Sequence, residues 1–284
     1  MQMAEQYLNT TSRARLPRRA VRSQRSFGMR ALFLLSFFLP STVGAQTLRI
    51  AAAADLQFVL PDLAAEYEKQ TGVKLAITYG SSGNFFAQIQ NSAPFDLFFS
   101  ADLDYPKKLT KAGFADSDSL QIYATGRLAL WLPPDSPLDP AAGLKALLDP
   151  RIQKIAVANP EHAPYGRAAI AAMQNAGLYD QLKPKLVFGE NISQAAQFVQ
   201  SGSAQAGLIA LSLALSPAMK NGKRWDIPAD RYPPIEQAVV VLKSSPNVQP
   251  AFSFLTFLKS PQARATFERY GFEVPHPASS EPKP

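Results

Sequence analysis

The chain has 284 residues, of which 46% are hydrophobic and 10% aromatic, a composition that excludes collagen-like, coiled-coil and disordered chains. Its formal net charge is +7, but residues 1–45 hold seven arginines and one acid, so the remainder carries 22 basic against 21 acidic groups. This balance argues against a nucleic-acid-binding surface on the body of the protein.

The first 45 residues have the pattern of a cleaved secretory signal. An arginine-rich stretch precedes the apolar run at residues 31–39, and small residues follow it in positions that suit cleavage after Ala45. A membrane anchor is the alternative, but this run is about half the ~20 apolar residues that span a bilayer. We therefore expect residues 1–45 to be a signal peptide and the mature protein to be periplasmic. The start of translation, Met1 or Met29, stays open.

Strand-like and helix-like segments alternate from residue 46 to 275, which is the pattern of parallel α/β units. Apolar runs predict strands at residues 48–53, 73–79, 96–99, 122–132, 154–158, 185–188, 207–211 and 236–242. Apolar residues at helical spacing predict helices at residues 56–70, 84–91, 165–177, 192–201, 250–259 and 261–270. The tail at 276–284 is rich in proline and serine, and we expect it to be disordered.

The two long predicted strands at 122–132 and 236–242 bracket a middle block with its own β-α-β pattern. This arrangement predicts two α/β lobes joined by a pair of crossing segments. We expect lobe 1 to comprise residues 46–128 and 237–284, and lobe 2 to comprise residues 129–236.

Catalytic signatures are scarce in this sequence. It has no cysteine and two histidines, His162 in a proline-bounded loop and His276 in the tail. It also lacks a Gly-x-Ser-x-Gly elbow, a phosphate loop and a dinucleotide-binding motif. We expect no enzymatic activity, no cofactor and no site for a free metal cation. An exported hydrolase that depends on His162, and a sensor or scaffold domain without a ligand, are the alternatives.

Four strand-to-helix junctions are rich in small residues. They lie at residues 51–55, 80–83, 160–166 and 189–193. The start of a helix leaves backbone N–H groups unpaired and carries a partial positive charge, so it can bind an anion. Each junction alone fits an ordinary capped turn, and Asn191 with Gln194 resembles a capping box. Four such junctions in two lobes favour an anion in the cleft, because ligands of open α/β sheets bind at the carboxyl ends of strands.

In order and spacing, these stretches resemble the periplasmic molybdate-binding proteins of ABC transporters, a branch of the two-lobed solute-binding family. The matching stretches include Ile50-Ala-Ala-Ala-Ala-Asp-Leu56, Gly80-Ser-Ser-Gly83, Ala93-Pro-Phe-Asp-Leu-Phe-Phe-Ser-Ala-Asp102, Ala158-Asn-Pro-Glu-His-Ala-Pro-Tyr-Gly166 and Glu190-Asn-Ile192. The resemblance implies a two-lobed periplasmic-binding-protein fold with the ligand cleft between the lobes. It also implies molybdate or tungstate as the ligand, an ABC permease of the inner membrane as the partner, and a monomer that binds no nucleic acid.

Carried over position by position, the resemblance implies that the Ser82 hydroxyl and the backbone N–H groups of Tyr165 and Ile192 bind the ligand. The chain departs from the family at Ala210, where some members have a tyrosine, and at Asp55, where relatives carry serine or asparagine. An ionised carboxylate ~4 Å from a dianion costs about 8 kcal/mol at an effective dielectric constant of about 20. Micromolar binding provides only about 8 kcal/mol in total.

Three roles for Asp55 stay open. Its side chain caps the helix that follows, or it accepts a hydrogen bond from a ligand that carries a proton, or the protein binds another anion such as sulfate or a phosphate-like anion. We favour the capping role, because aspartate is a preferred N-cap residue. In that case the groups that contact the oxyanion are only N–H and hydroxyl donors.

Overall fold

The computed structural model of the protein describes residues 46–275, and these residues belong to one compact unit. The predicted signal peptide and the predicted disordered tail lie outside the described residues. No helix in the described part is long and apolar enough to cross a bilayer.

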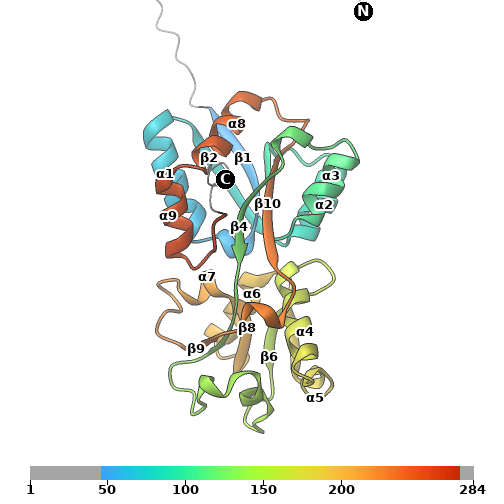
Figure 1. The fold of residues 1–284 in the computed structure, drawn as a ribbon, viewed down its shortest axis with the longest axis vertical. Helices are drawn as coiled ribbons and strands as arrows, with labels where there is room; N and C mark the ends of the chain where they lie inside the picture. Colours follow the sequence, from blue (N-terminus) through green and yellow to red (C-terminus); the bar gives the residue numbers. More distant parts are fainter. Residues whose placement is uncertain (1–45, 276–284) are drawn as a thin grey trace, which may run out of the picture. The chain divides into compact units, whose positions relative to one another are not determined.

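Within residues 46–275, ten strands form two five-stranded sheets, each flanked by helices (Figure 1). The first sheet has the order β2 (Lys74–Gly80), β1 (Thr47–Ala53), β3 (Leu97–Ser100), β10 (Ile235–Val241) and β4 (Gln121–Gly126). The second has the order β7 (Leu186–Gly189), β6 (Ile155–Ala158), β8 (Ala206–Ala210), β5 (Leu128–Leu132) and β9 (Lys223–Asp226). The predicted α/β class, with two sheets flanked by helices, is confirmed.

The helices alternate with these strands along the chain. They are α1 (Val59–Thr71), α2 (Ser82–Gln90), α3 (Asp104–Lys111), α4 (Pro164–Asn175), α5 (Tyr179–Leu182), α6 (Ile192–Gln200), α7 (Leu211–Ala214), α8 (Val248–Phe257) and α9 (Pro261–Arg269). Shorter 3₁₀ segments are Ala54–Leu56, Ser117–Ser119, Pro140–Leu148, Lys183–Lys185 and Ala229–Arg231.

The first sheet is covered on both faces because successive residues of a strand point to opposite sides. In β1, Ile50 belongs to the core under α1, α8 and α9, whereas Ala51 belongs to the core under α2 and α3. Val239 and Val240 of β10 divide between the same two cores. In Figure 1, α1 and α9 accordingly lie on one side of this sheet and α2 and α3 on the other.

The second sheet packs against α4 and α6. In α6 the buried apolar residues Ile192, Ala195, Ala196 and Val199 follow the spacing that places side chains on one face of a helix. This face seats α6 on β6 and β8, and so fixes where the helix begins relative to the ends of these strands.

The single strand predicted at residues 122–132 is wrong. The chain forms two strands, and it leaves the first sheet after β4 and enters the second at β5. Strand β4 pairs with β10, whereas β5 pairs with β8 and β9, so the ladder changes partners at Arg127. Apolar residues on both sides of Arg127 hide this change of partners in the sequence.

Other differences have local causes. Helix α1 begins at Val59 rather than at residue 56, because a separate 3₁₀ turn, Ala54–Leu56, precedes it. Helix α3 was not predicted, because it is mostly polar and buries only Pro106 and Leu109. Strand β9, at the edge of the second sheet, was also not predicted, because three of its four residues are charged and it has no apolar pattern. The lobe boundaries at residues 128 and 236 stay a prediction.

Candidate functional site

A small cavity lies between the two sheets, beyond the carboxyl ends of their parallel strands. Residues from both sheets line it: Ala53, Ala54, Asp55, Gly80, Ser81, Ser82, Ala101, Ala163, Pro164, Tyr165, Asn191 and Ile192. Its volume is about 10 Å³, which is room for one water-sized group. All four residues singled out from the sequence, Ser82, Tyr165, Ile192 and Asp55, therefore line one cavity.

Three helices begin at this cavity. Ser82 and Ile192 are the first residues of α2 and α6, and Tyr165 is the second residue of α4. The backbone N–H groups of a first helical turn have no acceptor within the helix, and they carry the positive end of the helix dipole. The cavity is therefore surrounded by donors and partial positive charge from three directions.

The caps of α2 and α6 leave the first N–H groups free. The Ser81 hydroxyl accepts from the backbone N–H of Asn84 at 3.4 Å. The Asn191 side chain accepts from the N–H of Gln194 at 3.1 Å, and the Gln194 side chain accepts from the N–H of Glu190 at 2.6 Å. Asn191 therefore caps α6, but the predicted capping box is incomplete, because Gln194 accepts from the residue before the N-cap rather than from the N-cap itself.

The Ser82 hydroxyl is fixed by a neighbouring strand end. It is buried, and its oxygen accepts from the backbone N–H of Ala101 at 2.9 Å. With that lone pair occupied, the hydroxyl hydrogen is free to be donated into the cavity. Ala210, the position where some family members have tyrosine, lies buried in β8 and is not among the residues that line the cavity.

The expected capping role of Asp55 is wrong. Helix α1 begins four residues later, with Phe58 as its N-cap and no side-chain cap. The 3₁₀ turn at Ala54–Leu56 separates the carboxylate from this helix start. Asp55 is instead fully buried, and its Oδ2 accepts from Gln237 Nε2 at 2.6 Å. Its Oδ1 has no hydrogen-bond partner among the described residues.

Gln237 on β10 organises the buried polar groups around Asp55. Its Oε1 accepts from the Tyr123 hydroxyl at 2.6 Å, and its Nε2 donates to the Tyr165 oxygen at 3.1 Å as well as to Asp55. Gln237 was not among the site residues predicted from the sequence. The available signal was that Gln237, next to Glu236, is one of the two polar residues in a strand whose other five residues are apolar.

Burial controls the ionisation of this cluster. It raises the pKa of Asp55 to about 6, although the hydrogen bond from Gln237 and the nearby Tyr165 hydroxyl partly oppose the shift. Burial, reinforced by the nearby charge of Asp55, also raises the pKa values of Tyr165 and Tyr123 well above their usual range. The two phenols therefore stay neutral where Asp55 changes its charge.

Polar contacts join the two sheets around the cavity. The backbone oxygen of His162 accepts from the N–H of Gly83 at 2.9 Å, and His162 Nδ1 lies 3.1 Å from the Ser81 hydroxyl. Side chains also pair across the cavity, Asn84 with Glu190 and Arg167 with Asp102. His162 therefore links the segments that belong to the two sheets through its backbone and its side chain. Its predicted position in a loop did not indicate this role.

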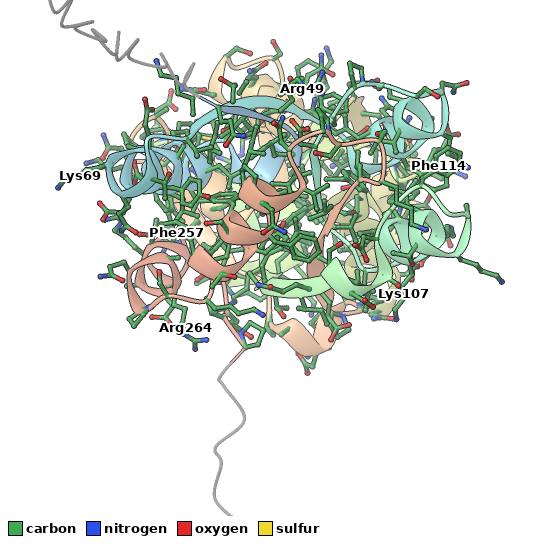
Figure 2. All side chains as sticks on the ribbon, turned by 90° about the horizontal axis from the view of Figure 1, so that it is seen from above. Arg49, Lys69, Lys107, Phe114, Phe257 and Arg264 are labelled. Carbon is green, nitrogen blue, oxygen red and sulfur yellow. The ribbon has the colours of Figure 1, made fainter. Side chains whose placement is uncertain are left out.

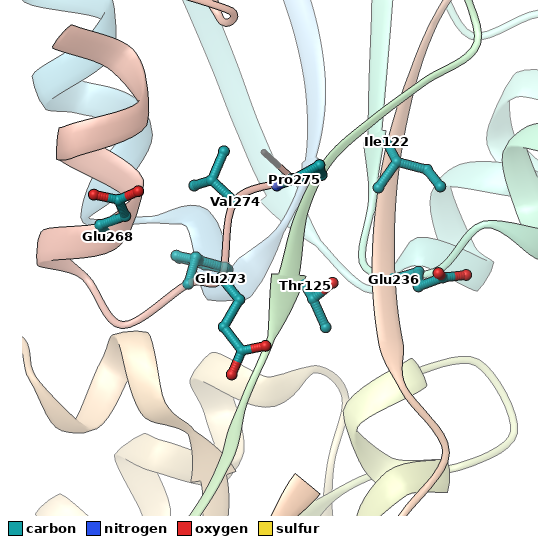
Figure 3. A pocket seen from close by; sticks show the side chains of 8 residues that line it. Ile122, Thr125, Glu236, Glu268, Glu273, Val274 and Pro275 are labelled. Carbon is teal, nitrogen blue, oxygen red and sulfur yellow. The ribbon is translucent and has the colours of Figure 1, made fainter. Parts of the chain in front are cut away.

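A larger cavity, of about 780 Å³, lies along β4 and the segment after α9 (Figure 3). Glu236, Glu268 and Glu273 line it, and no lysine or arginine does. Its charge is unfavourable for an anion. The basic side chains labelled in Figure 2, such as the exposed Lys69 and Lys107, lie on the outside of the molecule and supply no countercharge to either cavity.

Comparison with known proteins gives a consistent result. A family model described as bacterial extracellular solute-binding protein matches residues 48–273. The molybdate-binding protein ModA of Rhodobacter capsulatus is 37% identical over 248 residues, which are 86% of this chain and 95% of the relative. ModA of Azotobacter vinelandii is 36% identical over 229 residues, with 80% and 90% covered. The solved periplasmic molybdate-binding protein of Azotobacter vinelandii matches with a TM-score of 0.76 at 36% identity, covering 81% of this chain and 100% of that one.

Proposed function

The chain belongs to the family of bacterial extracellular solute-binding proteins, and we propose that it is the receptor of a molybdate ABC transporter. In this proposal it is exported by the signal in residues 1–45 and acts as a monomer in the periplasm. There it captures molybdate or tungstate and delivers the oxyanion to the permease in the inner membrane.

The observation that carries the proposal is the convergence of three helix starts on one cavity, in a chain 37% identical to a molybdate-binding protein. Backbone N–H groups at helix starts bind anions without a neutralising side-chain cation. The Ser82 hydroxyl and the N–H groups of Tyr165 and Ile192 are the proposed ligand groups. They are neutral donors held by secondary structure, which suits an oxyanion that only accepts hydrogen bonds.

The dimensions of the cavity favour a small inorganic anion. A volume of about 10 Å³ is far below the 300–1,000 Å³ typical of sites for organic ligands. Sugars, peptides and nucleotides would need a wide separation of the two sheets, whereas a tetrahedral oxyanion would need only a slight one. Opening and closing between the two lobes would provide this adjustment.

We propose no catalysis at this site. Ser81 and His162 form a serine–histidine pair, but the Ser81 hydroxyl already caps α2. Among the described residues, no carboxylate forms a hydrogen bond with His162 that would orient it as a general base. The pair thus lacks the third group of a hydrolytic triad.

Isothermal titration calorimetry of the purified protein with molybdate, tungstate, sulfate and phosphate tests the proposal. We expect molybdate and tungstate to bind with a Kd at or below about 1 μM, and sulfate and phosphate to bind at least about 100-fold more weakly. Stronger binding of sulfate or phosphate would assign the protein to another anion. Absence of any binding or thermal shift would favour a sensor or scaffold domain.

A further inference from the structure

We propose that Asp55 binds the oxyanion as a neutral carboxylic acid, donating a hydrogen bond from Oδ1, so that one proton is taken up with each dianion. The inference deepens the proposed function and rests on it, because it needs an oxyanion in the cavity. In this inference Asp55 determines whether the site prefers a dianion or an anion that carries its own proton.

The two oxygens of Asp55 are not equivalent. Oδ2 accepts from Gln237 Nε2 at 2.6 Å, whereas Oδ1 has no partner among the described residues. Asp55 is fully buried and lines the cavity, so Oδ1 is the oxygen that remains for a ligand. A buried polar atom without a partner is costly, and a bound group that satisfies it recovers this cost.

The orientation of Gln237 determines which oxygen carries the proton. Its Oε1 accepts from the Tyr123 hydroxyl, and its amide nitrogen faces Asp55. Both hydrogens of Nε2 are then committed, one to Oδ2 and one to the Tyr165 oxygen. Since Oδ2 receives a hydrogen, the proton of a neutral Asp55 belongs on Oδ1, which makes that oxygen a hydrogen-bond donor for a ligand.

Within residues 46–275, no basic side chain forms an ion pair with Asp55 that would offset its charge. Arg167, at the mouth of the cavity, is already paired with Asp102. A dianion and an ionised carboxylate would therefore repel each other at close range. Protonation removes this repulsion and replaces it with a hydrogen bond. The raised pKa of Asp55 means that this proton costs little near neutrality.

The other ionisable groups near the turn at Ala54–Leu56 could also take up a proton, and their contribution can be distinguished from that of Asp55. Elements α6 and α7 pack against this turn and have no ionisable side chain, whereas β2 contributes Tyr79. Burial raises the pKa of Tyr79 to about 12, so it stays neutral, as do the phenols from α4 and β4 described above. Asp102, which follows the lining residue Ala101, and His162, whose Nδ1 lies 3.1 Å from the Ser81 hydroxyl, each need a control variant.

The test is titration calorimetry with molybdate at about pH 8 in two buffers of different ionisation enthalpy, Tris and HEPES. Near pH 8 molybdate is a dianion and Asp55 is ionised without ligand, so we expect uptake of about one proton per molybdate. The Kd should rise about tenfold per pH unit above about pH 7.

Asp55→Asn keeps the shape of the side chain and offers an N–H donor in place of the carboxyl O–H. It should take up no proton, and it should bind molybdate about 10- to 100-fold more tightly than the wild type at pH 8.

Controls identify the group that takes up the proton. His162→Asn and Asp102→Asn should both retain the uptake, and Asp55→Ser replaces Asp55→Asn if the latter does not fold. The inference is overturned if the wild type binds molybdate without proton uptake, if a control variant abolishes the uptake, or if Asp55→Asn retains it. Tighter binding of hydrogen phosphate than of molybdate, without proton uptake, would instead make Asp55 an acceptor. Failure of wild type and Asp55→Asn alike to bind any oxyanion would refute the proposed function itself.

Discussion

At the scale of single residues, Asp55 imposes a cost on the fold that does not depend on a ligand. Its carboxyl group is fully buried and has one hydrogen-bonded oxygen, and burial raises its pKa from 3.8 to about 6. A shift of one pKa unit corresponds to about 1.4 kcal/mol, so ionised Asp55 destabilises the native state by up to about 3 kcal/mol. A site built only for stability would not keep this group.

The pH dependence of this cost predicts the effect of Asp55→Asn on the ligand-free protein. Between about pH 4 and pH 6 the native state keeps a proton that the unfolded state has lost, so native stability falls as the pH rises. The asparagine variant does not pay this cost. Its free energy of unfolding, relative to wild type, should increase by about 2–3 kcal/mol from pH 4 to pH 7.5, as measured by urea denaturation.

Asp96→Asn provides the matched control, because Asp96 is also fully buried. Its carboxylate accepts from the Arg49 backbone N–H and from the Ser245 hydroxyl, each at 2.7 Å, and lies 3.4 Å from the Arg49 guanidinium. Loss of that charge should destabilise the protein at pH 7.5, the opposite sign. A constant difference between Asp55→Asn and wild type across the pH range would contradict the prediction.

A second prediction concerns the proposed hydroxyl ligand. Ser82→Ala removes a hydrogen bond to a charged oxygen, which contributes about 1.5–3 kcal/mol, so the Kd for molybdate should rise about 10- to 150-fold in calorimetric titration. Ser119→Ala is the control. Its hydroxyl accepts from the backbone N–H of Val241 at 2.9 Å, as Ser82 accepts from Ala101 at 2.9 Å, but it lies away from the cavity. The control should lose similar stability and no affinity, and equal losses of affinity would remove Ser82 from the ligand set.

The sequence carries part of this site in local signals and part only in the fold. Ser82, Tyr165 and Ile192 stand at helix starts, which small and capping residues reveal without a structure. Gln237 could not be assigned this way, because its partners Asp55 and Tyr165 lie far along the chain and meet it only once the sheets form. The favoured role of Asp55 failed for the same reason, since a local cap was the one partner visible in the sequence.

At the scale of elements, the site depends on where three helices begin. Asn191→Ala removes the N-cap of α6 and should cost about 1 kcal/mol of stability. Fraying of that first turn also displaces the N–H of Ile192, so the Kd for molybdate should rise by about fivefold or more, since ~1 kcal/mol of binding energy is lost. Thermal unfolding and calorimetric titration measure the two effects.

Ser260→Ala tests whether the loss of affinity is specific. The Ser260 hydroxyl caps α9 by accepting from the N–H of Ala263 at 3.2 Å, close to the 3.1 Å of the Asn191 cap. Helix α9 covers the outer face of the first sheet and does not line the cavity. This variant should lose about the same ~1 kcal/mol of stability with no change in Kd. Parallel losses of affinity would mean that general instability, rather than the start of α6, weakens binding.

Predictions for elements succeeded where a segment is buried on a regular face. The alternation in β2 and the helical spacing in α6 both come from one-sided burial, and both segments were found. The break at Arg127 was missed, because β5 is buried along its whole length and continues the apolar run of β4. Partner exchange between sheets is a tertiary property that hydrophobic periodicity does not encode.

At the scale of the whole described unit, we expect the contacts across the cavity to govern how long a ligand stays bound. Two covalent crossings, at Arg127 and at the segment before β10, connect the sheets, and the Tyr232 hydroxyl accepts from the Leu128 N–H at 3.0 Å beside them. The pair of Arg167 with Asp102 and the pair of Asn84 with Glu190 bridge the sheets at the cavity mouth. When the sheets separate, the two side-chain pairs between them must break. The two crossing segments stay covalently intact and must bend.

Arg167→Gln therefore should accelerate ligand release. Arg167 pairs with Asp102 across the cavity mouth, and its side chain is 42% exposed, so the pair contributes only about 0.2–1 kcal/mol. That range corresponds to an increase of about 1.5- to 5-fold in the dissociation rate of molybdate, with little change in association, because interface changes act mainly on dissociation. Exchange of bound radiolabelled molybdate against unlabelled molybdate measures this rate.

Arg151→Gln is the control. Arg151 and Asp149 form an ion pair with a distance of 2.9 Å, and both residues belong to the part of the chain that forms the second sheet, so the variant should leave the rate unchanged. Equal acceleration by both variants would show that loss of surface charge, and not of the bridge between the sheets, releases the anion.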